Sequence, residues 1–111
     1  MQNNCLFCNI AKGIINSEKV YEDDEFIAFN DIKPIAKIHI LLIPKKHIIS
    51  MQYIDDSDTE LLGKMMILIS KIAKLHCNIN GFRLINNSGF IAKQEIMHLH
   101  FHIISDSNIL K

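Results

Sequence analysis

The feature that most constrains this chain is an alternation of histidine with large apolar residues near its C-terminus, from Met97 to Ile104. A period of two is the side-chain period of an extended strand, so the pattern predicts a strand over residues 96–104. One face would carry three imidazoles in a row and the other three apolar side chains: His98, His100 and His102 against Leu99, Phe101 and Ile103. Ordinary solvent faces of strands carry Lys, Glu and Thr, so the row indicates a functional site.

The composition narrows the class of protein. The 111 residues fit one domain, residues 1–111, and 49% of them are hydrophobic, so a proper core is expected. Acidic and basic residues balance at 12 each and Arg83 is the only arginine, which argues against nucleic acid and membrane surfaces as partners. No apolar run approaches the roughly 18 residues of a membrane span, and no signal peptide is visible. Three cysteines without secretory features favour a cytoplasmic protein.

Hydropathy and turn signals predict the elements that surround the histidine strand. A short helix should begin near Cys5 and end at Gly13. Four further strands are expected at residues 19–22, 26–29, 38–43 and 82–86. With the long helix described next, these elements predict an α+β fold in which helices pack on one antiparallel sheet.

The long helix is predicted over about residues 58–77. Ser57 and Glu60 have the spacing of a capping box at its start. Leucine, isoleucine and methionine recur at helical intervals from Leu61 to Leu75, so this stripe should face the core. Asn80–Gly81 supplies a residue that can adopt the left-handed conformation and end the helix.

Two kinds of chemistry place imidazoles on one strand face. A His-x-His pair can chelate zinc, with a third histidine completing a catalytic shell. A phosphoryl-transfer site instead uses one neutral imidazole as nucleophile, with neighbouring donors for the phosphoryl oxygens and no need for a metal at the reacting centre. Spacing alone leaves both open. His39, inside a predicted strand, is either a hydrogen-bonded core residue or a group that orients another imidazole.

A second motif, Cys5-x-x-Cys8, opens the chain. Such a pair is a zinc half-site, a redox pair or a coincidence. Zinc needs two more ligands, and only the histidines or Cys77 are left to supply them. Cys77, at the end of the predicted helix, is more readily explained as a small apolar residue.

These residues resemble the histidine triad (HIT) family, whose signature is His-φ-His-φ-His-φ-φ with φ hydrophobic. Residues 98–104 match every position, and residues 20–32, Pro34 and residues 39–47 resemble the Hint branch of nucleoside phosphoramidases. The resemblance implies a HIT-like five-stranded antiparallel sheet with two helices, paired in a homodimer as a continuous ten-stranded sheet. It also implies hydrolysis of the P–N bond of purine nucleoside 5′-phosphoramidates, such as AMP joined to an amine.

The resemblance also implies roles for individual residues. His100 matches the nucleophile that forms a nucleotidyl-histidine intermediate, His102 the histidine beside the α-phosphate, and His39 a hydrogen-bonding member of the same cluster. Asp31 matches the acid that holds the ribose hydroxyls of a purine nucleoside monophosphate. Ile32 lies beside Asp31 in this match, and Asn87 matches a polar residue near the phosphate. The apolar walls around the base match six residues: Leu6, Phe7, Ile10, Ile15, Phe29 and Leu41.

Many bacterial-type members of the family carry a C-x-x-C that forms a structural zinc site with two histidines. The matching positions are Cys5, Cys8, His47 and His98. On this implication His98 is a metal ligand that joins the N-terminal helix to the sheet, not a catalytic group.

The loop before the triad departs from the family pattern. The family usually has Gly-Gly-Gln-Ser or Gly-Gln-x-Val, whereas this chain has Ala92 followed by Lys93, Gln94 and Glu95. The match puts the last three near the phosphate, where Lys93 adds a positive charge and the Glu95 carboxylate replaces a hydroxyl. Repulsion between that carboxylate and a phosphate is about 1 kcal/mol or more. The resemblance as a whole implies a phosphoramidase. Glu95 makes a dimeric nucleotide-binding scaffold or sensor with little turnover the alternative, and a zinc hydrolase that uses all three histidines of the triad is less favoured.

Overall fold

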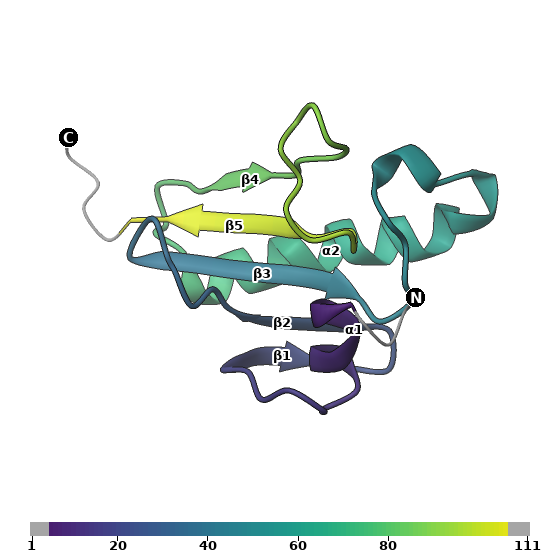
Figure 1. Ribbon diagram of the computed structural model, residues 1–111. Coiled ribbons are helices and arrows are strands. Elements are labelled where there is room, and N and C mark those ends of the chain that lie inside the picture. The colour runs from purple at the N-terminus through teal and green to yellow at the C-terminus, as the bar shows by residue number, and fades with distance from the viewer. Residues whose placement is uncertain (1–4, 107–111) are drawn as a thin grey trace.

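The computed structural model describes residues 5–106, which form a five-stranded antiparallel sheet with two α-helices (Figure 1). The strand order is β1-β2-β3-β5-β4. In chain order the elements are α1 (Leu6–Ala11), β1 (Lys19–Glu22), β2 (Phe26–Asn30), β3 (Ile38–Pro44), two 3-10 turns (Met51–Tyr53 and Asp56–Asp58), α2 (Thr59–His76), β4 (Arg83–Ile85) and β5 (Phe101–Ser105). The predicted α+β fold is confirmed.

One face of the sheet packs against α2, which lies behind the strands in Figure 1. Successive strand residues point to opposite faces, so Leu99, Phe101 and Ile103 all join this core, as the histidine alternation predicts. The helix contributes Met65, Leu68, Ile69, Ile72 and Ala73. Leu75, expected in the same stripe, is 80% exposed. At 100° per residue it lies about 90° from the centre of the buried arc, which explains that error.

The other face of the sheet packs against α1, in front of the strands in Figure 1. Phe7 and Ile10 of α1 contact side chains of β2 and β3, among them Phe29 and Leu41. Leu41 is paired with His102 on β5, and directly paired residues share a face of the sheet. The alternation therefore brings the histidines to the α1 face.

The histidine strand is shorter than predicted, since β5 begins at Phe101 and not at residue 96. The ladder between β3 and β5 ends where Leu42 pairs with Phe101. Further along β3, Pro44 has no N–H, and its carbonyl oxygen accepts a hydrogen bond from His98 Nε2 at 2.7 Å. The backbone N–H of Leu99 donates instead to Ile48. A pattern of period two thus continues beyond the hydrogen-bonded strand.

The ends of α2 also differ from the prediction. The capping box is formed by Asp55 and Asp58 around a 3-10 turn, not by Ser57 and Glu60. The helix ends at His76, before an extended Cys77. Gly81 therefore does not end the helix; it lies in the turn that follows, where its φ is +141°. Within residues 5–106 no helix combines the length and apolar character needed to cross a bilayer.

Candidate active site and metal centre

Four potential metal ligands converge where α1 meets the sheet: Cys5, Cys8, His47 and His98. Their facing atoms lie within 4.8 Å of one another. His98 Nδ1 is 3.4 Å from the sulfur of Cys5 and 3.4 Å from that of Cys8, and His47 Nδ1 is 3.1 Å from the sulfur of Cys8. A tetrahedral zinc ion requires ligand separations of roughly 3.3–3.8 Å. The four predicted ligands therefore come together in a group that could hold a metal ion.

The surroundings of this cluster suit a bound cation. His98 is fully buried, and its Nε2–H donates to the Pro44 carbonyl, which leaves Nδ1 with a lone pair that faces the sulfurs. Burial lowers the pKa of His98 to about 4, so the imidazole is neutral, as a metal ligand must be. Burial, together with the neighbouring Cys5 thiol, raises the pKa of Cys8 to about 11. Metal binding would therefore release a proton from Cys8.

His100 has one ring nitrogen held and the other left for chemistry. Its Nδ1–H donates to the main-chain carbonyl of His98 at 2.7 Å. A carbonyl can only accept, so this bond assigns the proton to Nδ1 and the lone pair to Nε2. Burial lowers the pKa of His100, against a smaller raising effect of Asp31 and Glu95, and the ring is therefore neutral. A neutral imidazole with a free Nε2 is the form required of a nucleophile.

His39 and His102 form a hydrogen-bonded pair with a defined direction. The backbone N–H of Ile35 donates to His39 Nδ1 at 3.2 Å, so the His39 proton is on Nε2. His39 Nε2 lies 2.9 Å from His102 Nδ1 and donates to it. The proton of a neutral His102 must then be on Nε2, away from His39. Burial, with the neighbouring His100 and His39, lowers the pKa of His102 to about 4, which keeps it neutral.

The Asp31 carboxylate lies beside the His39 ring of this pair. Its Oδ2 is 3.4 Å from His39 Nε2, and its Oδ1 accepts from the backbone N–H of Lys33 at 2.8 Å. The carboxylate is 20% exposed, so it is accessible to a ligand at the edge of the site. The oxygen and ring nitrogens of Asp31, His39 and His102 also lie within 4.8 Å of one another.

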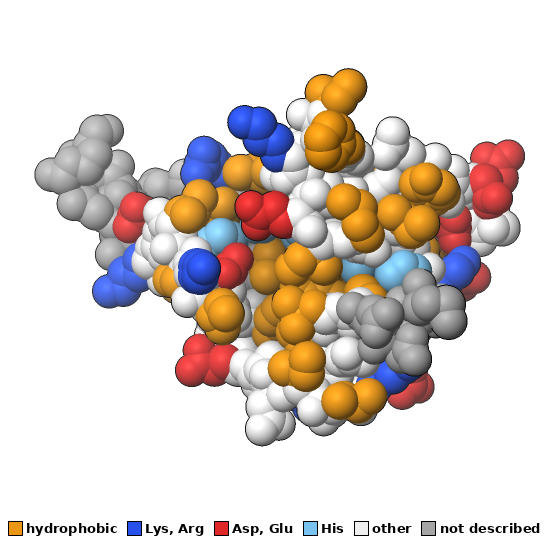
Figure 2. Space-filling model, viewed as in Figure 1, with side chains coloured by type: hydrophobic (Ala, Val, Ile, Leu, Met, Phe, Trp, Pro, Cys, Tyr) orange, Lys and Arg blue, Asp and Glu red, His pale blue; other side chains and the backbone are white. Residues whose placement is uncertain are grey.

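The apolar residues predicted around the base divide into a buried floor and exposed positions. Phe7, Ile10, Phe29 and Leu41 are each at most 7% exposed and pack together beneath the α1 face. Leu6, Ile15 and Ile32 are 42%, 38% and 92% exposed. The Phe7 ring meets the His100 ring edge-on, with centroids 5.1 Å apart. Figure 2 shows apolar side chains gathered over the centre of this face, with histidine side chains visible beside them.

The loop before the triad is anchored by Gln94, which is 7% exposed. Its side-chain amide donates to the carbonyls of Ile49 and Ile96 and accepts from the N–H of Gly89. Lys93 and Glu95, on either side, are exposed, and Lys93 has φ +63°, in the left-handed region. The anchored glutamine is thus flanked by two exposed side chains of opposite charge, of which Glu95 is close enough to His100 to raise its pKa.

The sequence analysis missed Asn86. Its Nδ2 donates to the main-chain carbonyl of His100 at 2.9 Å, while its Oδ1 accepts from Ser88. The next residue, Asn87, which the resemblance puts near the phosphate, is half-buried on the same loop. The only signal for Asn86 was the repeated asparagine after the fourth strand, which does not say which of the two reaches the site.

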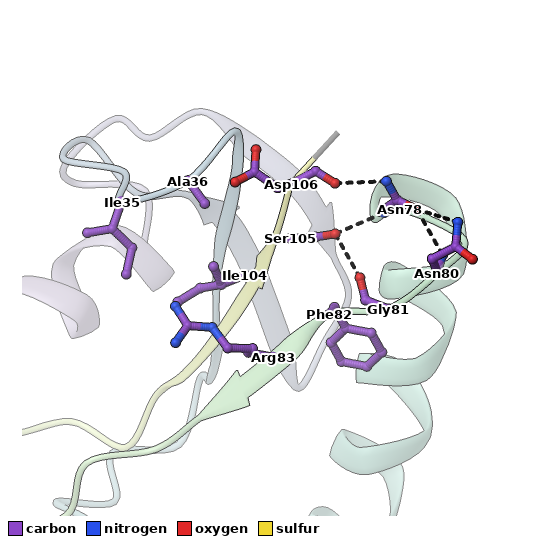
Figure 3. A pocket seen from close by; sticks show the side chains of 10 residues that line it. All are labelled: Ile35, Ala36, Asn78, Asn80, Gly81, Phe82, Arg83, Ile104, Ser105 and Asp106. Carbon is purple, nitrogen blue, oxygen red and sulfur yellow. Dashed lines mark hydrogen bonds between the residues drawn. The ribbon is translucent and has the colours of Figure 1, made fainter. Parts of the chain in front are cut away.

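A cavity of about 510 Å³ lies at the far end of β4 and β5 (Figure 3). It is lined by Ile35 and Ala36, by Asn78, Asn80 and residues 81–83 after α2, and by residues 104–106. Figure 3 shows the Arg83 side chain lying beside Ile104. The cavity borders the histidine pair through Ile35, whose N–H holds His39, but it contains no residue of the triad.

Comparison with known proteins shows to which family the chain is similar. The family model described as "Scavenger mRNA decapping enzyme C-term binding" matches residues 4–111. Protein HitA of Neisseria gonorrhoeae is 44% identical over 102 residues, which cover 92% of this chain and 95% of that protein. A histidine triad protein from Clostridium difficile is 45% identical and superposes with a TM-score of 0.88, over 97% of this chain and 95% of that one.

The chain belongs to the histidine triad (HIT) family. A HIT family hydrolase from Legionella pneumophila Philadelphia 1 is also similar, with 39% identity and a TM-score of 0.90 over 97% of this chain and 96% of that one. The resemblance inferred from residues 98–104 is thereby confirmed.

Proposed function

We propose that this HIT protein is a hydrolase that cleaves the P–N bond of purine nucleoside 5′-phosphoramidates through a nucleotidyl intermediate on His100. The observation that carries the proposal is the bond from His100 Nδ1 to the His98 carbonyl, which leaves Nε2 as the nucleophile of a neutral ring. The similar protein from Legionella pneumophila is a HIT family hydrolase, which supports hydrolysis as the reaction type.

The proton positions of the histidines support a two-step reaction. His100 Nε2 attacks phosphorus, the P–N bond breaks, and the nitrogen leaves as a neutral amine once it has gained a proton. His102 Nε2–H, fixed by the His39 pair, is a donor for a phosphoryl oxygen or the leaving nitrogen. Water then attacks the phosphorus–nitrogen adduct, which releases the nucleoside monophosphate and restores His100.

The nucleotide lies along the α1 face. The base packs over the apolar floor around Phe7 and Phe29, and the Asp31 carboxylate accepts hydrogen bonds from the ribose hydroxyls. Lys93 and Asn87 are close to the phosphate, and the peptide groups beside Gln94 are held in place by its three hydrogen bonds.

Zinc is the ion that the Cys5, Cys8, His47 and His98 cluster suits, because two thiolates and two imidazoles form a closed Cys₂His₂ site. Its role is structural: it joins α1, which carries Phe7, to the sheet.

The free edge of the sheet at β4 supports a homodimer as part of this proposal. On its outer side β4 has no partner among residues 5–106, and Leu84 and Phe82 are 40% and 43% exposed. Pairing of two β4 strands would cover this edge and give the ten-stranded sheet.

The second candidate is a dimeric nucleotide sensor with little turnover. Glu95 favours it, because this exposed carboxylate is close enough to His100 to influence its pKa. A negative charge at that point opposes a phosphate.

The deciding experiment measures turnover of a fluorogenic adenosine phosphoramidate by wild-type protein and His100→Ala, with AMP affinity measured on both by calorimetry. We expect turnover in the wild type, its loss in His100→Ala and retained AMP binding. A slow substrate should trap a covalent adduct on His100, visible by mass spectrometry. AMP binding with neither turnover nor adduct would favour the sensor.

A further inference from the structure

The metal cluster and the proposed nucleophile share a residue. His98 faces the two cysteine sulfurs through Nδ1, donates to Pro44 through Nε2, and accepts the His100 Nδ1–H bond with its main-chain oxygen. Because all three contacts belong to one fully buried residue, a change in the position of its ring moves the carbonyl that fixes His100.

A second connection runs through Phe7, which lies between Cys5 and Cys8 in the chain. Its ring meets the His98 ring with centroids 6.1 Å apart and the His100 ring at 5.1 Å, both edge-on. Any change that rearranges the two cysteines therefore also shifts an aromatic ring that packs on the nucleophile. Both connections join the same thiols to the same imidazole.

The two thiols are placed to react with each other. Cys5 precedes the first turn of α1, and the backbone N–H of Cys8 donates to its sulfur at 3.3 Å. Residues three apart across a helical turn have the Cα separation that a disulfide accepts. Cys8 is 4% exposed, whereas Cys5 is half-buried, so Cys5 is the sulfur that an oxidant reaches first.

We propose that Cys5 and Cys8 form a peroxide-sensitive modification site whose oxidation releases the bound ion and inactivates His100. The inference depends on the proposed function, since it concerns regulation of the same site. The Cys5 thiolate attacks a peroxide oxygen, which gives a sulfenic acid and expels hydroxide. The Cys8 sulfur then attacks the oxidised sulfur, a disulfide forms, and the second hydroxide leaves. Two electrons pass from the sulfurs to the peroxide, and neither thiolate remains to hold a cation.

The test uses the zinc-loaded full chain carrying Cys77→Ala, so that Cys5 and Cys8 are the only thiols. Hydrogen peroxide is titrated while three quantities are followed: the intact mass, zinc release with a chromogenic chelator, and the nitrogen NMR signal of the His100 Nδ1–H group. We expect a loss of two hydrogens, release of zinc in step with it, and weakening or exchange broadening of that signal. Turnover should fall about tenfold or more, and a dithiol reductant with zinc should restore it.

The matched control adds Cys5→Ser, which leaves Cys8 as a single thiol. It should show no loss of two hydrogens, because Cys8 has no second thiol with which to form the disulfide. A disulfide that forms in the Cys77→Ala protein without any change at the His100 signal would overturn the proposal, as would peroxide oxidation that leaves zinc bound. The mass, zinc and NMR results do not need turnover, so they decide the coupling even if the reduced protein hydrolyses no phosphoramidate.

Discussion

Replacement of His39 by alanine isolates the pair that sets the proton of His102. His39 is 6% exposed, accepts from Ile35 and donates to His102 Nδ1 at 2.9 Å. Without that donor, His102 is free to carry its proton on Nδ1, where no substrate atom can use it. The variant therefore changes the tautomer of His102 and leaves His100 with its bond to His98.

The magnitude follows from the lost hydrogen bond. Such a bond contributes about 0.5–1.5 kcal/mol, and a buried group left unpaired costs about 1–3 kcal/mol. About 1.4 kcal/mol corresponds to a factor of ten in rate. We expect kcat on an adenosine phosphoramidate to fall about tenfold with KM nearly unchanged, and the free energy of unfolding to fall by about 1–3 kcal/mol, because the Ile35 N–H also loses its acceptor.

Nitrogen NMR of the imidazoles checks the reasoning without relying on activity. In the wild type, His102 should show a protonated Nε2 and an unprotonated Nδ1, and His39→Ala should show a mixture. His76→Ala is the matched control, since His76 is exposed on α2, and it should change neither the His102 signals nor kcat. A wild-type His102 protonated on Nδ1, or an unchanged kcat in His39→Ala, would refute the proton assignment.

Three further predictions follow from the geometry. Lys93→Gly should raise the free energy of unfolding by about 1 kcal/mol in denaturant titrations, since a φ of +63° is strained for lysine, and a decrease would contradict the left-handed conformation. The Asp58 pKa is lowered by its bond to Lys46, so its contribution to stability is present above its ordinary pKa of 3.8 and is lost as pH falls through the folded value. Lys46→Met should therefore lose less stability than wild type between about pH 5 and pH 2 by thermal melting, and equal losses would exclude this pair. Cys5→Ser combined with Cys8→Ser should abolish stoichiometric zinc in elemental analysis, and retained zinc would reassign the ligands.

The local patterns of the chain were enough to predict the layers of the fold. The apolar residues at 99, 101 and 103 lie in the α2 core, and the triad faces α1, because alternation is a property of an extended backbone wherever its hydrogen bonds end. The limits of elements were less predictable. The capping box at Asp55 and the start of β5 at Phe101 depend on competing hydrogen bonds from residues outside each element, which no local pattern contains.

By itself the sequence determined the composition of the site: three alternating histidines, a C-x-x-C pair and a histidine in the central strand. Only the tertiary structure decided that the three histidines have different partners. His98 lies against cysteines about ninety positions away, His100 donates to the main-chain carbonyl of His98 two positions away, and His102 accepts from His39, which is 63 positions away. The physical reason is that the proton and charge of an imidazole depend on its hydrogen-bond partners and its burial. Those are provided here by the meeting of α1, β3 and β5.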